Sequence, residues 1–510
     1  MGLATIYTRA QHGLDAPLVR VETHVGGGLP KFSIVGLPET AVKESRDRVR
    51  AALKQCYFEF PAGRVTVNLS PADLPKHGGR FDLPIALGIL AASGQLTGDQ
   101  SKQAINDHEF FGELSLSGKI REFQSALPIA LAALKTEDHH RDLIMPAKAA
   151  AQAALVPDIR VLEATHLLDV IAHLRGEQPL DERPASEHNT QTVSDKLDLA
   201  DVKGQAVAKR ALEIAAAGQH SLMMVGPPGT GKTMLAKRLP GLLPAMTTQE
   251  ALESAAILSI SNQGFNASQW QQRPFREPHH TASTIALVGG GSQPRPGEIS
   301  LAHRGVLFLD ELPEFDRRVL ESLRQPLEAG KVTVSRAARQ AEFPARVQLV
   351  AAMNPCPCGY LGDLEKECRC GGAQISRYQA KVSGPLLDRI DLHIHVGRID
   401  QRQLTTTATT EATAQVCQRV IKASKRQWRR AKTANATMTV PEMEQYCPLP
   451  DSATELIKHA MTKLKLSARS YHRIIKIART IADLDARENI VQADVAEAIQ
   501  LRCLDRQSHH

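Results

Sequence analysis

Short apolar runs and helical repeats alternate along the first third of the chain. Val19–His24 and Arg64–Asn68 have the length and the composition of strands. Between them, Glu39–Gln55 places apolar residues on one side at helical spacing. This mixture predicts an α/β domain at the N-terminus.

A second α/β pattern begins near residue 200 and gives way to a helical one. A helix is expected over Ala206–Gly218, and strands are expected over Gly305–Leu309 and Val347–Ala352. Ile390–Val396 alternates apolar with polar residues, as a more exposed strand would. The helices expected beyond it are Ala414–Lys432, Ser452–Leu466, Arg469–Asp485 and Gln492–Leu504.

Two stretches with few large apolar residues separate these patterns. Residues 177–195 combine prolines, charges and small polar residues, and residues 401–413 are mostly threonine, so both are expected to be linkers. The sequence therefore predicts a multidomain α/β protein. Its parts are an N-terminal domain (1–176), an α/β core (196–400) and a C-terminal helical lid (414–510).

Composition and charge narrow the functional classes. The 510 residues, 42% of them hydrophobic, are enough for about three globular domains. The sequence contains neither an apolar run of about 18 residues nor a signal-peptide pattern, so a cytoplasmic protein without a membrane partner is expected. The formal charge of +7 is compatible with a nucleic-acid partner, and the aromatic content of only 4% favours contacts with phosphates over base stacking.

The strongest motif follows the apolar run that begins at Ser221. It reads Gly-x-x-x-x-Gly-Lys-Thr between a strand and a helix, which is the setting of a phosphate-binding loop. Backbone N–H groups and Lys232 would bind the phosphates of ATP, and the Thr233 hydroxyl would bind Mg²⁺. The residues of this loop are Gly226, Pro227, Pro228, Gly229, Thr230, Gly231, Lys232 and Thr233.

Polar residues at the ends of two later strands predict hydrolysis as well as binding. Asp310 and Glu311 end an apolar strand, where Asp310 can hold Mg²⁺ and Glu311 can polarise the attacking water. Asn354 ends the next strand and can orient that water, although asparagine is also an ordinary turn former.

These motifs resemble a known family. The phosphate loop, Asp310-Glu311, Asn354 and Leu386–Asp391 look like an AAA+ ATPase of the magnesium-chelatase and minichromosome-maintenance helicase branch. Pro278–Ser283, Gly297–His303 and Asn354–Gly359 resemble more closely the bacterial ComM/YifB family.

The resemblance implies a motor on DNA. In this branch, Arg389 would complete the site of a neighbouring subunit, and Arg469 on the helical lid would sense the bound phosphate, with Arg473 a weaker choice. Arginines acting between subunits imply a ring, expected to be a homohexamer. The family resemblance further implies a helicase that promotes branch migration of single-stranded or branched DNA during homologous recombination in natural transformation.

DNA contacts are expected in a hairpin between the Asp310 and Asn354 strands. In Lys331–Phe343, β-branched residues alternate with other residues along the first half, and basic residues follow near the expected turn. The related helicases carry such a hairpin in the ring pore, whereas an ordinary surface hairpin is the alternative. A second basic segment, Arg419–Lys432, is either a duplex contact or a solvated lid helix. The DNA-binding residues expected in the hairpin are Lys331, Arg336 and Arg339.

Four of the eight cysteines form two Cys-x-Cys pairs within a short polar loop. Four thiolates can close a tetrahedral Zn²⁺ site, which would stabilise a loop with so little apolar content. Four reduced thiols and an oxidisable cluster are the alternatives, because Cys-x-x-Cys is the commoner zinc spacing. The cysteines are Cys356, Cys358, Cys368 and Cys370.

The N-terminal region carries its own resemblance. Phe111–Leu134 and Asp142–Pro146 are similar to the peptidase domain of Lon proteases, which implies a fold like domain 2 of ribosomal protein S5. The catalytic serine and lysine of that family fall on Gly78–Asp82 and near Leu127, so this domain is expected to be catalytically empty.

Two other functions are compatible with an ATPase of this kind. One is the motor subunit of a magnesium chelatase, against which the Lon-like domain and the basic hairpin argue. The other is a protein-remodelling ATPase without proteolytic activity, in which the Lon-like domain would bind protein.

Overall fold

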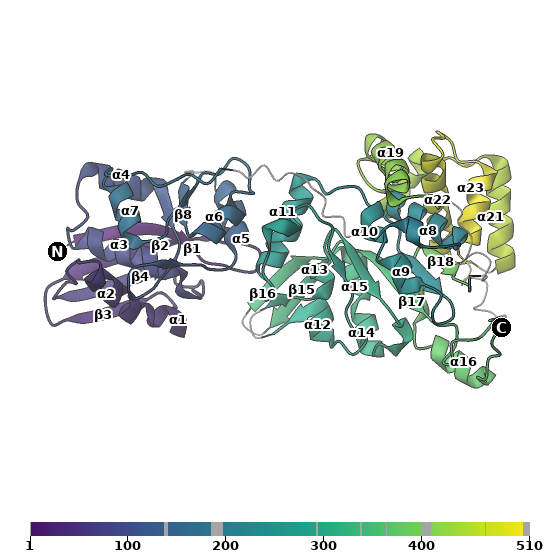
Figure 1. The fold of residues 1–510 in the computed structure, drawn as a ribbon, viewed down its shortest axis with the longest axis horizontal. Coiled ribbons are helices and arrows are strands. Elements are labelled where there is room, and N and C mark those ends of the chain that lie inside the picture. Colours follow the sequence, from purple (N-terminus) through teal and green to yellow (C-terminus); the bar gives the residue numbers. More distant parts are fainter. Residues whose placement is uncertain are drawn as a thin grey trace. The chain divides into compact units, whose positions relative to one another are not determined.

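The chain forms two compact units in the computed structural model (Figure 1). One unit comprises Met1–Thr190 with Ala251–Trp270, and the other Gln191–Glu250 with Gln271–His510. Most of the two predicted linkers, residues 185–195 and 401–409, lies outside the described residues. Of Ala267, Arg336 and Arg339 only the backbone is described. The described residues are 2–136, 141–184, 197–291, 294–336, 339–363, 365–399, 410–464 and 466–502.

The two larger sheets of the N-terminal unit have apolar faces that helices cover. The first is four-stranded, with the order β1-β2-β4-β3, and α3 packs across β1 and β2. The second is a parallel three-stranded sheet, β5-β8-β9. The principal elements are β1 (Gly2–Arg9), β2 (Leu18–Gly26), β3 (Lys31–Val35), α1 (Thr40–Lys43), α2 (Ser45–Gln55), β4 (Arg64–Ser70), α3 (Asp82–Ala92), α4 (Asp99–Asp107), β5 (His108–Phe110), α5 (Ala126–Leu134), β8 (Asp142–Met145), α6 (Ala147–Ala153), β9 (Val161–Glu163), α7 (Leu167–Leu174) and most of α11 (Thr248–Ser259).

Two details of this unit differ from the sequence prediction. The single helix expected over Glu39–Gln55 is two helices, because at Glu44 the chain forms a three-residue turn in which the Asp47 N–H bonds the Glu44 carbonyl at 3.1 Å. In addition, Ala251–Trp270 packs with the N-terminal unit: Ala255 and Phe265 belong to the apolar cluster that contains Leu127.

A parallel five-stranded sheet organises the second unit. Its order is β11-β14-β17-β10-β18, so the carboxyl ends of β14, β17 and β10 meet at one edge. This sheet confirms the strands predicted around Gly305–Leu309 and Val347–Ala352. The elements around it are α8 (Ala206–Gly218), β10 (Leu222–Val225), α9 (Lys232–Ala236), α10 (Leu239–Leu242), β11 (Phe275–Arg276), β14 (Val306–Leu309), α14 (Arg317–Ser322), α15 (Arg324–Ala329), β15 (Lys331–Arg336), β16 (Arg339–Pro344), β17 (Gln348–Met353), α16 (Gly372–Gln379), α17 (Gly384–Leu387) and β18 (Leu392–His395).

The prediction of an exposed strand at Ile390–Val396 was wrong. Leu392, His393 and Ile394 of β18 are all buried, although the strand lies at the sheet edge. Leu392 and Ile394 pack in the apolar core of this unit, and the N–H of His393 bonds the carbonyl of Leu501 at 2.7 Å. Alternation in the sequence therefore did not mark a solvent-facing side.

The C-terminal region is helical, as the sequence predicts, and packs against α8. One short helix, α20, was not predicted, because its seven residues are too few to establish a helical period. The helices are α19 (Thr413–Ala431), α20 (Val440–Tyr446), α21 (Asp451–Leu464), α22 (Ala468–Leu484) and α23 (Gln492–Gln500).

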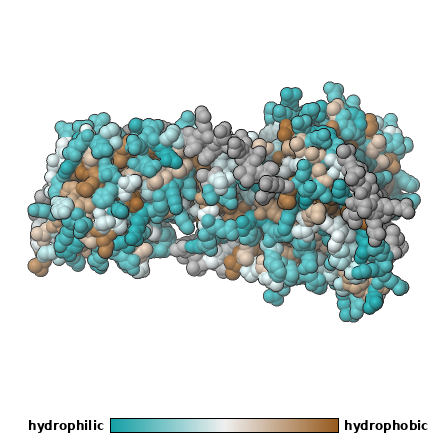
Figure 2. All heavy atoms as spheres, in the orientation of Figure 1, coloured by the Kyte–Doolittle hydropathy of each residue, from teal (hydrophilic) through white to brown (hydrophobic). Residues whose placement is uncertain are grey.

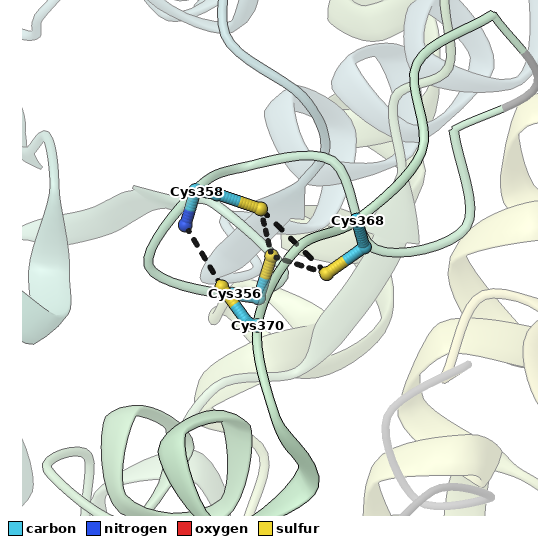
Figure 3. Close-up of side chains that lie close together, drawn as sticks. All are labelled: Cys356, Cys358, Cys368 and Cys370. Carbon is cyan, nitrogen blue, oxygen red and sulfur yellow. Dashed lines mark hydrogen bonds between the residues drawn. The ribbon is translucent and has the colours of Figure 1, made fainter.

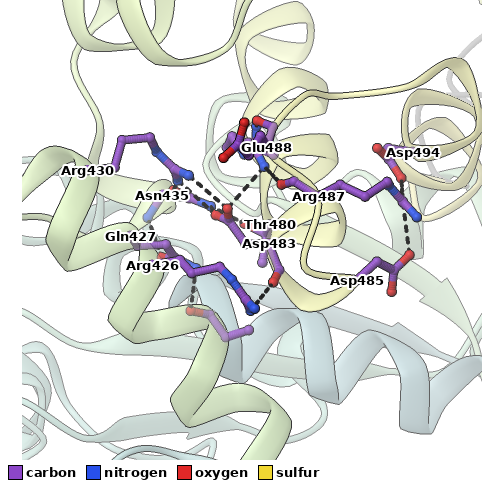
Figure 4. Close-up of polar contacts among 12 residues, drawn as sticks. Arg426, Gln427, Arg430, Asn435, Thr480, Asp483, Asp485, Arg487, Glu488 and Asp494 are labelled. Carbon is purple, nitrogen blue, oxygen red and sulfur yellow. Dashed lines mark hydrogen bonds and ion pairs between the residues drawn. The ribbon is translucent and has the colours of Figure 1, made fainter.

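Buried polar contacts join these helices (Figure 4). Arg430 on α19 forms two bonds of 2.8 Å with the carboxylate of Asp483 on α22, and Arg426 donates to the Asp483 carbonyl at 3.0 Å. Asn435 donates to the same carboxylate at 2.9 Å. Two arginines of the basic segment Arg419–Lys432 are therefore occupied within the lid, which favours a structural role for that part of the segment.

The visible surface is mainly hydrophilic, with scattered hydrophobic residues (Figure 2). Among the described helices, none combines the length and the apolar character needed to cross a membrane.

Candidate active site

The phosphate loop lies at the carboxyl edge of the parallel sheet, between β10 and α9. Gly229 and Gly231 have φ angles of +77° and +87°, which glycine adopts without strain. A side chain at Gly226 would overlap the carbonyl of Val396, so the loop needs a glycine where it leaves β10. The resulting cavity has a volume of about 400 Å³. Its lining consists of Pro228, Gly229, Thr230, Gly231, Lys232, Thr233, Met234, Asp310, Glu311, Met353 and Asn354.

Lys232 is held within the loop. Its ammonium group donates to the carbonyls of Gly226 and Pro227 at 2.7 and 2.8 Å. It also donates to Asn354 Oδ1 at 3.2 Å. Burial lowers the pKa of Lys232, and the nearby carboxylates of Asp310 and Glu311 oppose that shift. The lysine is thus placed beside the asparagine at the end of β17, where the terminal phosphates would lie.

Thr233 and Asp310 bring two oxygen atoms together across the cavity. The Thr233 hydroxyl donates to Asp310 Oδ2 at 2.6 Å. A hydroxyl and a carboxylate are hard oxygen ligands of the kind that Mg²⁺ binds together with phosphates and water. The donor set therefore fits Mg²⁺, with these two side chains as its protein ligands.

Glu311 lies beside Asp310 in an unusual backbone conformation. Its φ is +50°, which is uncommon for a residue with a side chain and is typical of functional sites. His280 approaches it, with Nδ1 3.4 Å from Glu311 Oε2. The sequence predicts no role for His280, which lies in the family motif Pro278–Ser283. A contact between residues this far apart in the chain has no local signal.

Asn354 follows β17 directly, and β17 is the parallel neighbour of β10. Met353 pairs with Val225 in the register of these strands, which brings Asn354 beside the start of the phosphate loop. Its side chain lines the cavity with Lys232 and Glu311. In this position the amide can hydrogen-bond a water molecule or a terminal phosphate oxygen.

Two predicted arginines do not line this cavity. Arg389, which follows α17, donates to the Pro385 carbonyl at 2.6 Å and forms an ion pair with Glu328. Arg469 is exposed in the first turn of α22. Arg473, one turn further along, pairs with Asp391, whose carboxylate also accepts from the N–H of Ser221 at 3.1 Å. Arg473 therefore connects the lid to the first residues before β10.

The basic hairpin is present. β15 and β16 pair antiparallel over six residues each, with Lys331 opposite Pro344. Lys331 Nζ lies 2.9 Å from Glu342 Oε2 on the facing strand, and both side chains are about half exposed. The hairpin carries Arg336 and Arg339 at the tip of its strands, and their side chains lie outside the described part of the protein.

The four cysteines converge in the loop after Asn354 (Figure 3). The Cys356 sulfur lies 3.4 Å from that of Cys358 and 3.6 Å from that of Cys368, and the Cys358–Cys368 distance is 3.6 Å. All four sulfurs lie within 4.8 Å of one another. Backbone N–H groups of Tyr360 and Arg369 lower the pKa of the Cys358 thiol to about 6. Four convergent sulfurs with N–H donors are compatible with a zinc site.

Known proteins resemble the chain over its whole length. Residues 198–404 match the family described as magnesium chelatase, subunit ChlI. Residues 21–149 match the family described as subunit ChlI of Mg-chelatase, and residues 410–502 match the one described as magnesium chelatase, subunit ChlI C-terminal. Competence protein ComM of Haemophilus influenzae is 51% identical over 99% of this chain and 98% of that relative. YifB of Escherichia coli is 48% identical over 99% of this chain and 98% of that relative. The magnesium-chelatase 67 kDa subunit of Heliobacterium mobile is 29% identical over 33% of this chain and 29% of that protein.

Proposed function

The chain belongs to the ComM/YifB family of magnesium-chelatase-like AAA+ ATPases, and we propose that it is a ring-shaped motor that hydrolyses ATP to move DNA. The observation that carries the proposal is that Lys232, Asp310, Glu311 and Asn354 line one and the same cavity. The name of the Haemophilus relative, a competence protein, supports a role in the uptake and recombination of DNA. Branch migration of recombination intermediates is the activity we assign.

Five polar side chains of the cavity are assigned a part in hydrolysis. Lys232 binds the terminal phosphates of ATP. Thr233 and Asp310 would hold Mg²⁺, which supplies positive charge that neutralises the phosphates. Glu311 accepts the proton of the attacking water, and Asn354 orients that water. The amide of Asn354 already accepts from Lys232, so both groups can turn toward a bound phosphate together.

Arg389 is assigned to the neighbouring subunit's site. It does not line the cavity of its own chain, and its Nε has no hydrogen-bond partner among the described residues. A guanidinium that enters a neighbour's cavity stabilises charge in the transition state. Arg469 on the exposed start of α22 is assigned to phosphate sensing. We propose a homohexamer, in which hydrolysis at one junction moves the lid and the hairpins.

The N-terminal unit is assigned a binding role. Leu127, near the position of the Lon lysine, is fully buried among apolar residues, and Gly78–Asp82 lead into α3 without a serine. A serine–lysine pair is required for proteolysis of the Lon type. We propose that this unit has no peptidase activity and contacts partners or substrate.

DNA-stimulated ATPase activity and strand displacement test the proposed function directly. Both are measured on four-way, forked and linear DNA of matched length. A DNA motor for branched intermediates shows stimulation and displacement, greatest on the four-way substrate. ATPase activity without DNA stimulation or displacement would instead favour a protein-remodelling ATPase.

Replacing Arg336 by alanine is expected to weaken DNA binding to a similar degree across sequences. A plot of the logarithm of the DNA-binding constant against the logarithm of the salt concentration has a negative slope, and each lost phosphate contact reduces its magnitude by about 0.9. DNA-free ATPase activity is expected to remain close to wild type, because the change lies in β15 and outside the nucleotide cavity. Binding is measured by fluorescence anisotropy between 50 and 200 mM salt, roughly the range over which such contacts are resolved.

The matched control for this variant is Lys458→Ala, which removes an exposed positive charge from α21. It is expected to leave DNA binding nearly unchanged. Unchanged DNA binding by Arg336→Ala would remove the hairpin from the proposed DNA path.

Purified protein is expected to carry about one zinc ion per chain, held by the four cysteines. Cys368→Ser removes one of the four sulfurs and is expected to lower the zinc content substantially. Metal analysis of the two proteins after gel filtration measures this. A metal-free wild-type protein with full activity would eliminate the zinc site.

A further inference from the structure

The four-cysteine loop packs against the nucleotide site. Gly359, between Cys358 and Tyr360, has a φ of +85°. A Cβ added there would lie 2.7 Å from Pro228 Cδ of the phosphate loop and 3.8 Å from Asn354 Cγ. The backbone at Gly359 therefore lies against Pro228 and near Asn354, two residues that line the nucleotide cavity.

The segment after the cysteines returns to the same place. Cys370 is followed by α16, whose last residue, Gln379, donates from Nε2 to the Pro355 carbonyl at 3.1 Å. The neighbouring Tyr378 is buried. The chain at Asn354 and Pro355 is thus held by β17 before it and by α16 after it, with the cysteine loop alongside.

The sulfurs are the contacts that close this loop at its base. Cys356 is fully buried two residues after Asn354, and its sulfur lies 3.6 Å from that of Cys368, across the loop. Sulfurs bound tetrahedrally to one zinc ion are about 3.8 Å apart, close to the separations observed. Arg398 also binds this loop, through ion pairs with the buried carboxylate of Asp363 at 2.7 Å and with Glu365 at 2.8 Å.

We propose that a metal ion held by the four cysteines positions Asn354 and Pro228, so that metal occupancy controls ATP hydrolysis. Cys356, Cys358, Cys368 and Cys370 then act as positioning residues as well as ligands. Without the metal, four separate thiols do not fix the loop, and the amide of Asn354 and the wall formed by Pro228 lose their support. This inference rests on the proposed ATPase activity and does not require DNA to be the substrate.

Two glycine substitutions in the same loop test the contact while every cysteine remains. Gly359→Ala places a methyl group against Pro228, whereas Gly362→Ala, at a similar φ of +75°, has no atom within 4 Å among the described residues. Both variants carry a similar backbone strain. We expect Gly359→Ala to lower kcat about 10- to 100-fold and to weaken ADP binding, since small displacements of positioned groups have effects of that size.

Gly362→Ala is expected to keep kcat and ADP affinity within about twofold of wild type. Zinc content is expected to be unchanged in both variants, so any difference between them comes from the contact with the phosphate loop. Wild-type kcat and ADP affinity in Gly359→Ala, with zinc retained, would overturn the proposal, as would equal losses in the two variants.

Removal and return of the metal test its role without a mutation. Zinc is stripped from the full-length protein with a chelator, and DNA-free kcat, ADP affinity and circular dichroism are measured before and after zinc is added back. We expect kcat and ADP affinity to fall together and to recover with zinc, while the helical signal is preserved. Unchanged kcat and ADP affinity in the stripped protein would overturn the proposal.

These readouts separate the inference from the proposed motor activity. A protein whose DNA-free ATPase depends on zinc but which neither binds nor displaces DNA would refute the motor and leave the metal dependence standing. Conversely, a DNA motor whose ATPase ignores the metal would refute only the inference. ADP affinity tests the contact between Gly359 and Pro228 even when kcat for ATP hydrolysis is low.

Discussion

Replacement of Glu311 by glutamine is expected to lower kcat for ATP hydrolysis by about 10²–10⁴-fold while ATP remains bound. The amide keeps the size of the carboxylate but cannot accept a proton from the attacking water. ATP binding is retained, because the hydrogen bonds of Lys232 and Thr233 go to groups other than the Glu311 side chain. Steady-state phosphate release measures kcat, and a fluorescent ATP analogue measures binding.

The control is Glu314→Gln, which removes an acidic group three residues along the chain and outside the cavity lining. It is expected to keep kcat within about threefold of wild type. If Glu311→Gln hydrolysed ATP at the wild-type rate, a group other than Glu311 would have to act as the base. A loss of ATP binding in Glu311→Gln would also contradict the assignment, since it would place Glu311 in binding rather than in proton transfer.

The convergence of the polar residues of the candidate nucleotide site on one cavity could be predicted, because these residues are tied to local patterns. Parallel strands align their carboxyl ends, so polar residues directly after apolar runs fall on one edge of the sheet. That geometry explains why Asp310 and Asn354, 44 residues apart in the printed sequence, both line the cavity with Lys232. The strand order, which places β17 between β14 and β10, was not needed for this prediction.

What the sequence did not predict depends on contacts between distant segments. The approach of His280 to Glu311 and the packing of Gly359 against Pro228 both join loops from different parts of the second unit. β18 is buried because Leu392 and Ile394 pack in the apolar core of the second unit, and Leu501 bonds its free edge at His393. No period or motif within these segments records their partners, because tertiary packing overrides local pattern.

Charged residues illustrate the same difficulty. The basic run in α19 was open to a duplex contact, yet Arg426 and Arg430 bind Asp483 inside the lid. Arg419 likewise pairs with Glu213 on α8 at 2.5 Å. A sequence shows the charge of a helix face but not the carboxylates that meet it. The hairpin β15–β16 is therefore the better candidate for contact with DNA phosphates.

Replacement of Arg389 by alanine is expected to lower kcat by about 10³–10⁵-fold with little change in ATP affinity. In its own chain the guanidinium binds Glu328 and the Pro385 carbonyl, away from the cavity lining, so its loss should not disturb the bound nucleotide. Arg429→Ala, which removes an exposed arginine from α19, is the control and is expected to keep wild-type activity. Full activity of Arg389→Ala would exclude the assigned role.

Mixing two inactive proteins distinguishes action on a neighbour from action within one chain. Arg389→Ala subunits retain Glu311, and Glu311→Gln subunits retain Arg389, so a junction between them in the right order contains both groups. In a randomly mixed ring about one quarter of the junctions meet this condition, and ATPase activity should reappear on mixing with a maximum near equal proportions. If Arg389 acted within its own chain, no subunit of the mixture would hold both groups, and activity would stay absent at every ratio.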